Sequence, residues 1–413
     1  MKPITKGIGY LWRYGTLVVV MVVLAGSAGV MGAEYYNTVH FGEPSASLDA
    51  TPTGSPAWVR FDENGANLLV WGHEGPNDIR LLGRDLGTRK VLELPSSGFT
   101  VKGVEWCEGY DRIVVWGSPG EDLNDTLVYY KSPSWSIDEG LLSEDLLPLV
   151  EIDYVLSLAS NIIFAVAGRD ANGTSRVLMV ETGSKNILRD DLVPDNSSVV
   201  RIGTDGRFMI VLNDIGRLSV YSTKNWTLMH HKDIRSTPFS SHFIEKGNIE
   251  KLFGRQDGTV TSYREIQLNE SKSFSTGNGP VFGVWIADIG DDQSYIVAAT
   301  PEGEESSTIQ IWDPMGGANW SLHRSSTIDG RVSMMAMDPT SNRTIVVAFQ
   351  DGSVALYELI VKTHEKDDTP SDWWVPYVGI GSFVVIVLAV AYYILTKRRG
   401  RVGEKAILDE NQE

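Results

Sequence analysis

The sequence predicts an all-β fold, a seven-bladed β-propeller of four-stranded antiparallel blades, together with one or two transmembrane helices. Three observations support this prediction: a repeated unit, Gly-containing turns inside the units, and uncharged apolar segments near both ends. A chain of 413 residues would suggest two or three domains on length alone, but a fixed internal period takes precedence over that expectation.

The repeated unit consists of an apolar strand, a turn, and a second strand that ends in an aromatic or aliphatic residue followed by a polar one. Its clearest copy is Ile309–Trp312 followed by Asp313, and the equivalent strands end at Leu82, Tyr130, Val180, Tyr221, Tyr263 and Tyr357. Asp-Gly pairs such as Asp257-Gly258 and Asp351-Gly352 favour the left-handed backbone angles of tight hairpins. Four short antiparallel strands per 40–50 residues are typical of a propeller blade.

The pattern assigns strands within each unit. The predicted second strands are Leu68–Trp71, Ile113–Trp116, Ile162–Ala167, Phe208–Leu212, Ile249–Phe253, Tyr295–Ala299 and Thr344–Phe349. The predicted third strands are Ile79–Leu82, Leu127–Tyr130, Val177–Val180, Leu218–Tyr221, Val260–Tyr263, Ile309–Trp312 and Val354–Tyr357. More polar fourth strands follow, as at Lys90–Leu94 and Thr227–His231.

Residues 50–360 resemble a WD-repeat or closely related quinoprotein-like β-propeller, here tethered to a membrane. The resemblance rests on Trp312-Asp313, which matches the namesake dipeptide of the WD repeat; Tyr357-Glu358 and Tyr221-Ser222 keep only the character of that position. The one Gly-His pair, Gly72-His73, follows an apolar strand, whereas WD repeats usually carry this pair near the start of a unit. The resemblance implies a fold and names no ligand.

The last unit stops after its third strand, at Leu359-Ile360. The alternating residues of Tyr35–Phe41 predict that the N-terminal segment supplies the missing outer strand, which would remove an exposed sheet edge. The alternative is that residues 35–50 form a stalk.

The ends of the chain predict a membrane topology. Residues 1–33 form either a cleaved signal peptide or a retained N-terminal anchor, with Lys2, Lys6 and Arg13 preceding an apolar run. The propeller then occupies residues 34–360, and an acidic juxtamembrane linker occupies 361–374. Residues 375–396 carry no charge and are long enough for a membrane-spanning helix, and the basic residues of the tail, 397–413, predict that the tail is cytoplasmic.

The central segment is therefore expected to be extracytoplasmic or lumenal. Seven Asn-x-Ser/Thr sequons agree with this location and are candidates for glycosylation: Asn124, Asn172, Asn196, Asn225, Asn269, Asn319 and Asn342. The chain has a formal net charge of −17, concentrated between the apolar ends, which repels phosphates and argues against a nucleic-acid partner.

No local motif indicates catalysis, so the chain is interpreted as a non-enzyme, without a cofactor or catalytic residues. Asp288, Asp291 and Asp292 are weak candidates for a cation site, although a solvated turn explains them better. Cys107 is the only cysteine, which excludes an internal disulfide and the vicinal pair of quinone-dependent dehydrogenases. The seven histidines are expected on the surface or in turns, and Trp135 and Trp320 are loop residues that could belong to a binding surface.

The hypothesis from the sequence is an extracytoplasmic β-propeller, anchored in the lipid bilayer, that acts as a binding or scaffold module for a protein, peptide or glycan. One alternative is a subunit of a larger membrane or surface-layer assembly. Another is a propeller hydrolase or lyase with an active site at the channel mouth. The enzyme alternative would require acidic or histidine residues from several blades to converge on the axis of the ring.

Overall fold

The computed structural model describes residues 35–365 except 52–53, 55–57, 108, 110, 122, 139–147, 159–162, 182–185, 205–206, 235, 244–249, 265–268, 278, 289–293, 304, 314–320 and 342. The chain divides into two compact units, of which Val39–Val361 is the propeller and Met1–Thr38 with Lys362–Glu413 is the other. In the described ranges, no helix has the length and apolar character needed to span a bilayer. The predicted membrane segments, within residues 1–33 and at 375–396, lie outside those ranges.

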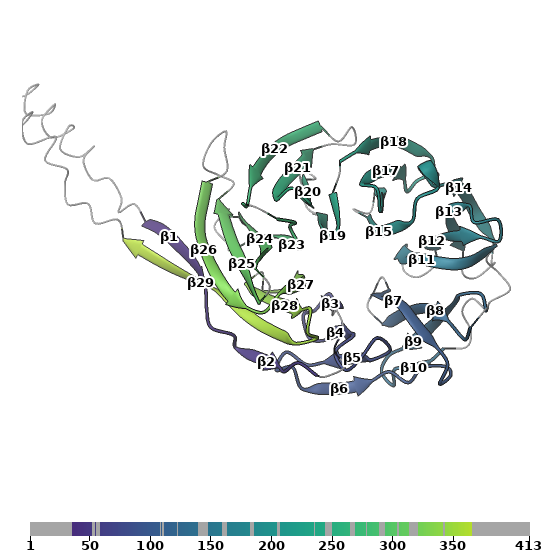
Figure 1. The fold of residues 1–413 in the computed structure, drawn as a ribbon, viewed down its shortest axis with the longest axis horizontal. Helices are drawn as coiled ribbons and strands as arrows, with labels where there is room; N and C mark the ends of the chain where they lie inside the picture. Colours follow the sequence, from purple (N-terminus) through teal and green to yellow (C-terminus); the bar gives the residue numbers. More distant parts are fainter. Residues whose placement is uncertain are drawn as a thin grey trace, which may run out of the picture. The chain divides into compact units, whose positions relative to one another are not determined.

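Seven antiparallel sheets form the blades of the propeller, and Figure 1 shows them arranged as a ring. The innermost strands are β3 (Trp58–Phe61), β7 (Thr100–Trp106), β11 (Leu149–Leu158), β15 (Val199–Thr204), β19 (Ser236–Phe243), β23 (Gly283–Asp288) and β27 (Val332–Met337). The second strands are β4 (Leu68–Trp71), β8 (Arg112–Ser118), β12 (Ile163–Asp170), β16 (Phe208–Asn213), β20 (Glu250–Arg255), β24 (Ser294–Glu302) and β28 (Thr344–Phe349).

The third strands are β5 (Ile79–Leu82), β9 (Thr126–Lys131), β13 (Ser175–Glu181), β17 (Arg217–Ser222), β21 (Thr259–Arg264), β25 (Ser306–Asp313) and β29 (Val354–Glu365). The outer strands of the first six blades are β6 (Thr88–Val91), β10 (Ser136–Ile137), β14 (Ile187–Leu192), β18 (Leu228–Asp233), β22 (Asn269–Ser275) and β26 (Ser321–Asp329). A single 3₁₀ turn, η2 (Pro194–Asn196), is described between β14 and β15. The prediction of seven four-stranded blades is confirmed.

The seventh blade is completed by the start of the chain. Strands β1 (Tyr35–Phe41) and β2 (Ala46–Leu48) both pair with β29, and the Gly42 amide donates to the Glu358 carbonyl at 3.0 Å. The prediction that Tyr35–Phe41 closes the ring is therefore confirmed, and the stalk alternative is wrong. The amide of Val39 also donates to Nε2 of His323 on β26 at 3.0 Å, so the N-terminal strand contacts the sixth blade as well.

The repeated aromatic or aliphatic position of the sequence coincides with a recurring irregularity of the outer hairpin. In five blades the pairing of the third and outer strands shifts register between this residue and the one before it, at Leu82, Val180, Tyr221, Tyr263 and Trp312. A bulge of this kind bends and twists the strand locally. All five side chains are buried, and the bulge allows the polar outer strand to follow the curvature of the ring.

The hydrophobic core lies between neighbouring blades. One cluster joins Val59 and Phe61 of the first blade to Met334 and Val346 of the seventh, and another joins Leu69 of the first blade to residues of the second. The largest cluster extends from the second blade through the third to the fourth. Because each blade buries its two faces against its neighbours, opening the ring at any one point exposes apolar surface on two blades.

Candidate functional site

Four neighbouring inner strands each carry one charged or aromatic polar residue: Arg60 on β3, Glu105 on β7, Tyr154 on β11 and Arg201 on β15. We call these four residues the inner-strand cluster. The pairing with the second strands puts Arg60 opposite Leu69 and Glu105 opposite Val114, which are equivalent positions of the first two blades. Tyr154 and Arg201 lie opposite Ala167 and Leu212, two positions earlier in the strand register. Alternate residues of a strand share a face, so the four side chains lie on corresponding faces of their blades.

Glu105 is fully buried and has a complete set of partners. Its Oε1 atom lies 2.8 Å from Nη1 of Arg60 and accepts the Trp106 amide at 3.0 Å. Its Oε2 atom accepts the Tyr154 hydroxyl at 3.0 Å. Burial raises the pKa of that hydroxyl, so it remains a donor. A buried carboxylate is tolerated only when it is paired and hydrogen-bonded, and these contacts, from three blades, meet that requirement.

Arg201 differs from the other members of the cluster. Its side chain is half-buried, and among the described residues it makes no hydrogen bond or ion pair. Burial lowers the pKa of its guanidinium; the charge of nearby Arg60 lowers it further, while Tyr154 and Glu105 raise it. A guanidinium remains charged in proteins and offers five N–H donors, so Arg201 is a cation without a hydrogen-bond or ion-pair partner among the described residues.

The sixth and seventh blades present apolar side chains at the corresponding inner-strand positions. Trp285 lies opposite Val297 and Ala336 opposite Val346, which are the positions equivalent to Arg60 and Glu105. The Trp285 indole donates to the Met335 carbonyl at 2.7 Å, and this bond fixes the ring against the seventh blade. The described part of the centre of the ring is therefore asymmetric, polar over the first four blades and apolar over the last two.

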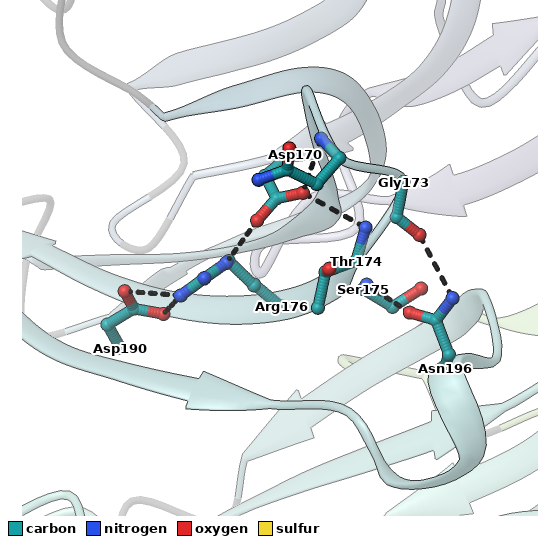
Figure 2. Close-up of polar contacts among 8 residues, drawn as sticks. Asp170, Gly173, Thr174, Ser175, Arg176, Asp190 and Asn196 are labelled. Carbon is teal, nitrogen blue, oxygen red and sulfur yellow. Dashed lines mark hydrogen bonds and ion pairs between the residues drawn. The ribbon is translucent and has the colours of Figure 1, made fainter.

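A second polar cluster surrounds the turn between β12 and β13 and is shown in Figure 2. Asp170 accepts the amides of Asn172 and Thr174 and forms an ion pair with Nε of Arg176 at 2.8 Å. Nη1 of the same arginine reaches Asp190 on the outer strand at 2.8 Å. Asp170 therefore neutralises the charge of Arg176 and also accepts two backbone amides of the turn.

Two sequons meet at this turn. Oδ1 of Asn196 accepts the Ser175 amide at 2.5 Å, and its Nδ2 donates to the carbonyl of Gly173 at 3.0 Å (Figure 2). Gly173 is the central residue of the sequon of Asn172, so the Asn196 side chain binds the backbone of its neighbour. Asn196 has a positive φ of 53°, a conformation that Asn tolerates better than most residues. Asn196 is therefore a structural residue as well as a candidate acceptor.

The structure describes some of the other candidate glycosylation sites and not others. Asn124, Asn172 and Asn225 are exposed, and each lies in a turn between strands. Asn269 begins β22, whereas Asn319 and Asn342 lie outside the described residues.

Most of the weak cation candidate lies outside the described residues. Asp288 ends β23, while Asp291 and Asp292 lie outside the described residues. In the described part of the chain, no group of three or more His, Cys, Asp or Glu side chains has a geometry that could hold a metal ion. Cys107 is free and buried, and burial raises the pKa of its thiol, so it behaves as a core residue.

Two expectations about individual residues require correction. His73 lies in a turn, as predicted, but it is buried, and its Nδ1 lies 3.0 Å from the Gly352 carbonyl of the seventh blade. It therefore helps to join the first blade to the last. Trp135 does not stand free on a loop, because its ring packs edge-on against Trp106 with the centroids 5.7 Å apart. Trp320, the other loop candidate, lies outside the described residues.

The sequence interpretation missed the inner-strand cluster. Its members are separated by about one repeat, and this spacing is the signal in the sequence, because it puts them on corresponding faces of successive blades. The search for acidic and histidine groups overlooked it, since the cluster contains two arginines and one carboxylate.

Comparison with known proteins supports the fold. No family model matches the chain, and no curated protein matches it. By contrast, 1507 chains of solved structures match. One belongs to the crystal structure of the mitotic checkpoint complex; it aligns with a TM-score of 0.58 at 11% identity, over 77% of this chain and 96% of that chain. At this identity the similarity shows a shared fold alone, and a fold found this widely does not select one function.

Proposed function

We propose that this chain is a membrane-anchored β-propeller, exposed outside the cytoplasm, that binds a protein, peptide or glycan partner. Two parts of the proposal can be separated: that the propeller binds a partner, and that it is anchored in a membrane with the ring on the extracytoplasmic side.

The observation that carries the binding part is the inner-strand cluster. The fully buried Glu105 pairs with Arg60, and beside this pair Arg201 has no partner among the described residues. A cation without a partner favours recognition of an anionic group. Glu105 is already saturated by Arg60 and Tyr154, so the cluster supports a binding role better than the acid–base chemistry of a hydrolase.

The membrane part rests on the sequence. Residues 375–396 carry no charge, aromatic residues flank them, and Lys397, Arg398, Arg399 and Arg401 follow. The sequons between the apolar ends support an extracytoplasmic ring.

A subunit of a larger membrane or surface-layer assembly is the second candidate. Apolar side chains are exposed on several outer strands, among them Leu192 on β14, Met229 on β18 and Leu322 on β26, which are 62%, 51% and 48% exposed. In such an assembly, these side chains would be points of lateral contact with other proteins.

The test is to express the full chain with a tag on the tail, solubilise membranes gently, and identify what copurifies. A reproducible partner recovered at well below one copy per ring supports a ligand-binding module. A partner recovered at a fixed number of copies per ring favours the assembly. Protease treatment of sealed vesicles tests the topology at the same time. Cleavage of the ring from the cytoplasmic side would contradict the extracytoplasmic location.

A further inference from the structure

The inner-strand cluster has more positive than negative charge. Its two guanidiniums, Arg60 and Arg201, face one carboxylate, that of Glu105, and Tyr154 is neutral because burial raises its pKa. Glu105 is engaged by Arg60 at 2.8 Å, so the uncompensated charge resides on Arg201. The whole chain has a net charge of −17, which makes a surplus positive charge at the centre of the ring notable.

The cluster itself shows which anion its geometry accepts. Around Glu105, a carboxylate sits against a guanidinium, a tyrosine hydroxyl and a backbone amide that come from three adjacent blades. Arg201 lies beside the same tyrosine, one blade further round, and its own donors are unused among the described residues. One uncompensated positive charge matches one carboxylate and is insufficient for a doubly charged phosphate.

We propose that Arg201 binds the carboxylate of an Asp or Glu side chain presented by a peptide or protein partner at the centre of the ring. This inference rests on the proposed binding function and specifies the chemistry of the partner. The planar fork of the guanidinium forms two parallel hydrogen bonds to a carboxylate, and Arg60 supports the anion from the neighbouring position without leaving Glu105.

The acidic surface of the ring would make this recognition selective. A partner that is acidic overall is repelled by a chain of this net charge, so an isolated carboxylate in a neutral or basic segment fits best. The apolar side of the centre, which includes Trp285, offers contacts for the uncharged part of such a segment.

The experiment measures the accessibility of Arg201 directly. The full chain in detergent is treated with phenylglyoxal, which modifies guanidiniums, and labelling of individual arginines is followed by peptide mass spectrometry. The probes are the blocked tripeptide Ala-Glu-Ala, its neutral counterpart Ala-Gln-Ala, and inorganic phosphate at matched ionic strength. Arg324, exposed on β26, is the internal control because it has the same chemistry far from the cluster in the fold.

The probe concentration is chosen for a dissociation constant of about 1 mM. At about 10 mM, the Glu peptide should therefore slow the labelling of Arg201 about tenfold. The Gln peptide should not protect Arg201, phosphate should protect it less than the Glu peptide, and none of the probes should protect Arg324.

Three results would overturn the proposal: no labelling of Arg201 in the absence of a probe, equal protection by the Glu and Gln peptides, or stronger protection by phosphate. If the Glu peptide protected Arg324 as much as Arg201, the effect would come from general electrostatics, and this result would also contradict a site at Arg201. Since the measurement is made in detergent, it does not depend on topology. A cytoplasmic ring would refute the proposed location and leave the protection of Arg201 unaffected. Absence of that protection would refute this inference and leave the proposed location unaffected.

Discussion

Removing Arg60 while leaving Glu105 in place should destabilise the propeller strongly. In the Arg60→Met variant, the Glu105 carboxylate stays fully buried and keeps only the Tyr154 hydroxyl and the Trp106 amide as hydrogen-bond donors. The guanidinium that neutralises it at 2.8 Å is lost. The variant therefore isolates the cost of an uncompensated charge at the centre of the ring.

The magnitude follows from the burial of the two partners. Breaking a buried ion pair by removing one partner costs about 3–5 kcal/mol. The Arg60 side chain is 34% exposed whereas Glu105 is 0% exposed, so the pair is only partly desolvated and the lower end, about 3 kcal/mol, applies. Replacing both residues, as in Arg60→Met with Glu105→Leu, removes the buried charge; it should cost only about 1 kcal/mol, mainly because the Tyr154 hydroxyl loses its acceptor.

Thermal unfolding of the full chain checks this prediction. At roughly 2 °C per kcal/mol for a large domain, Arg60→Met should lower Tm by about 6 °C and the double variant by about 2 °C. Arg324→Met, which removes the same charge from an exposed position of β26, should leave Tm unchanged. The reasoning is refuted if the double variant is as unstable as Arg60→Met, because the loss would then come from packing and not from the unpaired carboxylate.

Three further predictions concern other parts of the ring. Desolvation raises the pKa of Asp153 to about 6. The folded state therefore loses stability, by at most about 3 kcal/mol, as pH rises from about 4 through 6. Asp153→Asn keeps an oxygen for the Val199 amide, so this variant should raise Tm at pH 7.5 and leave it unchanged at pH 4. Asn196→Gln should lower stability by about 1–2 kcal/mol in chemical denaturation because it breaks the bonds to two backbone groups, whereas Asn172→Gln, at an exposed position, should not. Deletion of residues 35–48 should leave β29 as an open edge and produce aggregation on size-exclusion chromatography; a monodisperse product of unchanged Tm would contradict the closure.

Much of the fold could be predicted because its signals are local. Apolar runs recur in every unit, and the second strand that they predict at Leu68–Trp71 coincides with β4. Outer strands were less certain, and the one predicted at Lys90–Leu94 lies at Thr88–Val91. Outer strands carry polar side chains on a solvated surface, so neither periodicity nor burial marks their ends sharply.

The site could not be predicted in the same way, because it depends on register between blades that are distant in sequence. Nothing local distinguishes Glu105 from a surface acid, and its burial follows only from its contacts with Arg60 and Tyr154. His73 was placed in a turn correctly, but its burial follows from a bond to Gly352, which is 279 residues away.

The closure of the seventh blade by β1 and β2 has a consequence for biosynthesis. The hydrogen bond from Ser45 to the Leu356 carbonyl spans 311 residues, so the first strands to be made must wait for the last strand before they can pair. At about 5–20 residues per second, this wait lasts on the order of 15 to 60 seconds. During that time the ring is incomplete, and the unpaired N-terminal segment is a ready substrate for chaperones or for a second copy of the chain. A nascent chain that ends before β29 therefore leaves β1 and β2 without the strand they pair with, so the ring can close only after full-length synthesis.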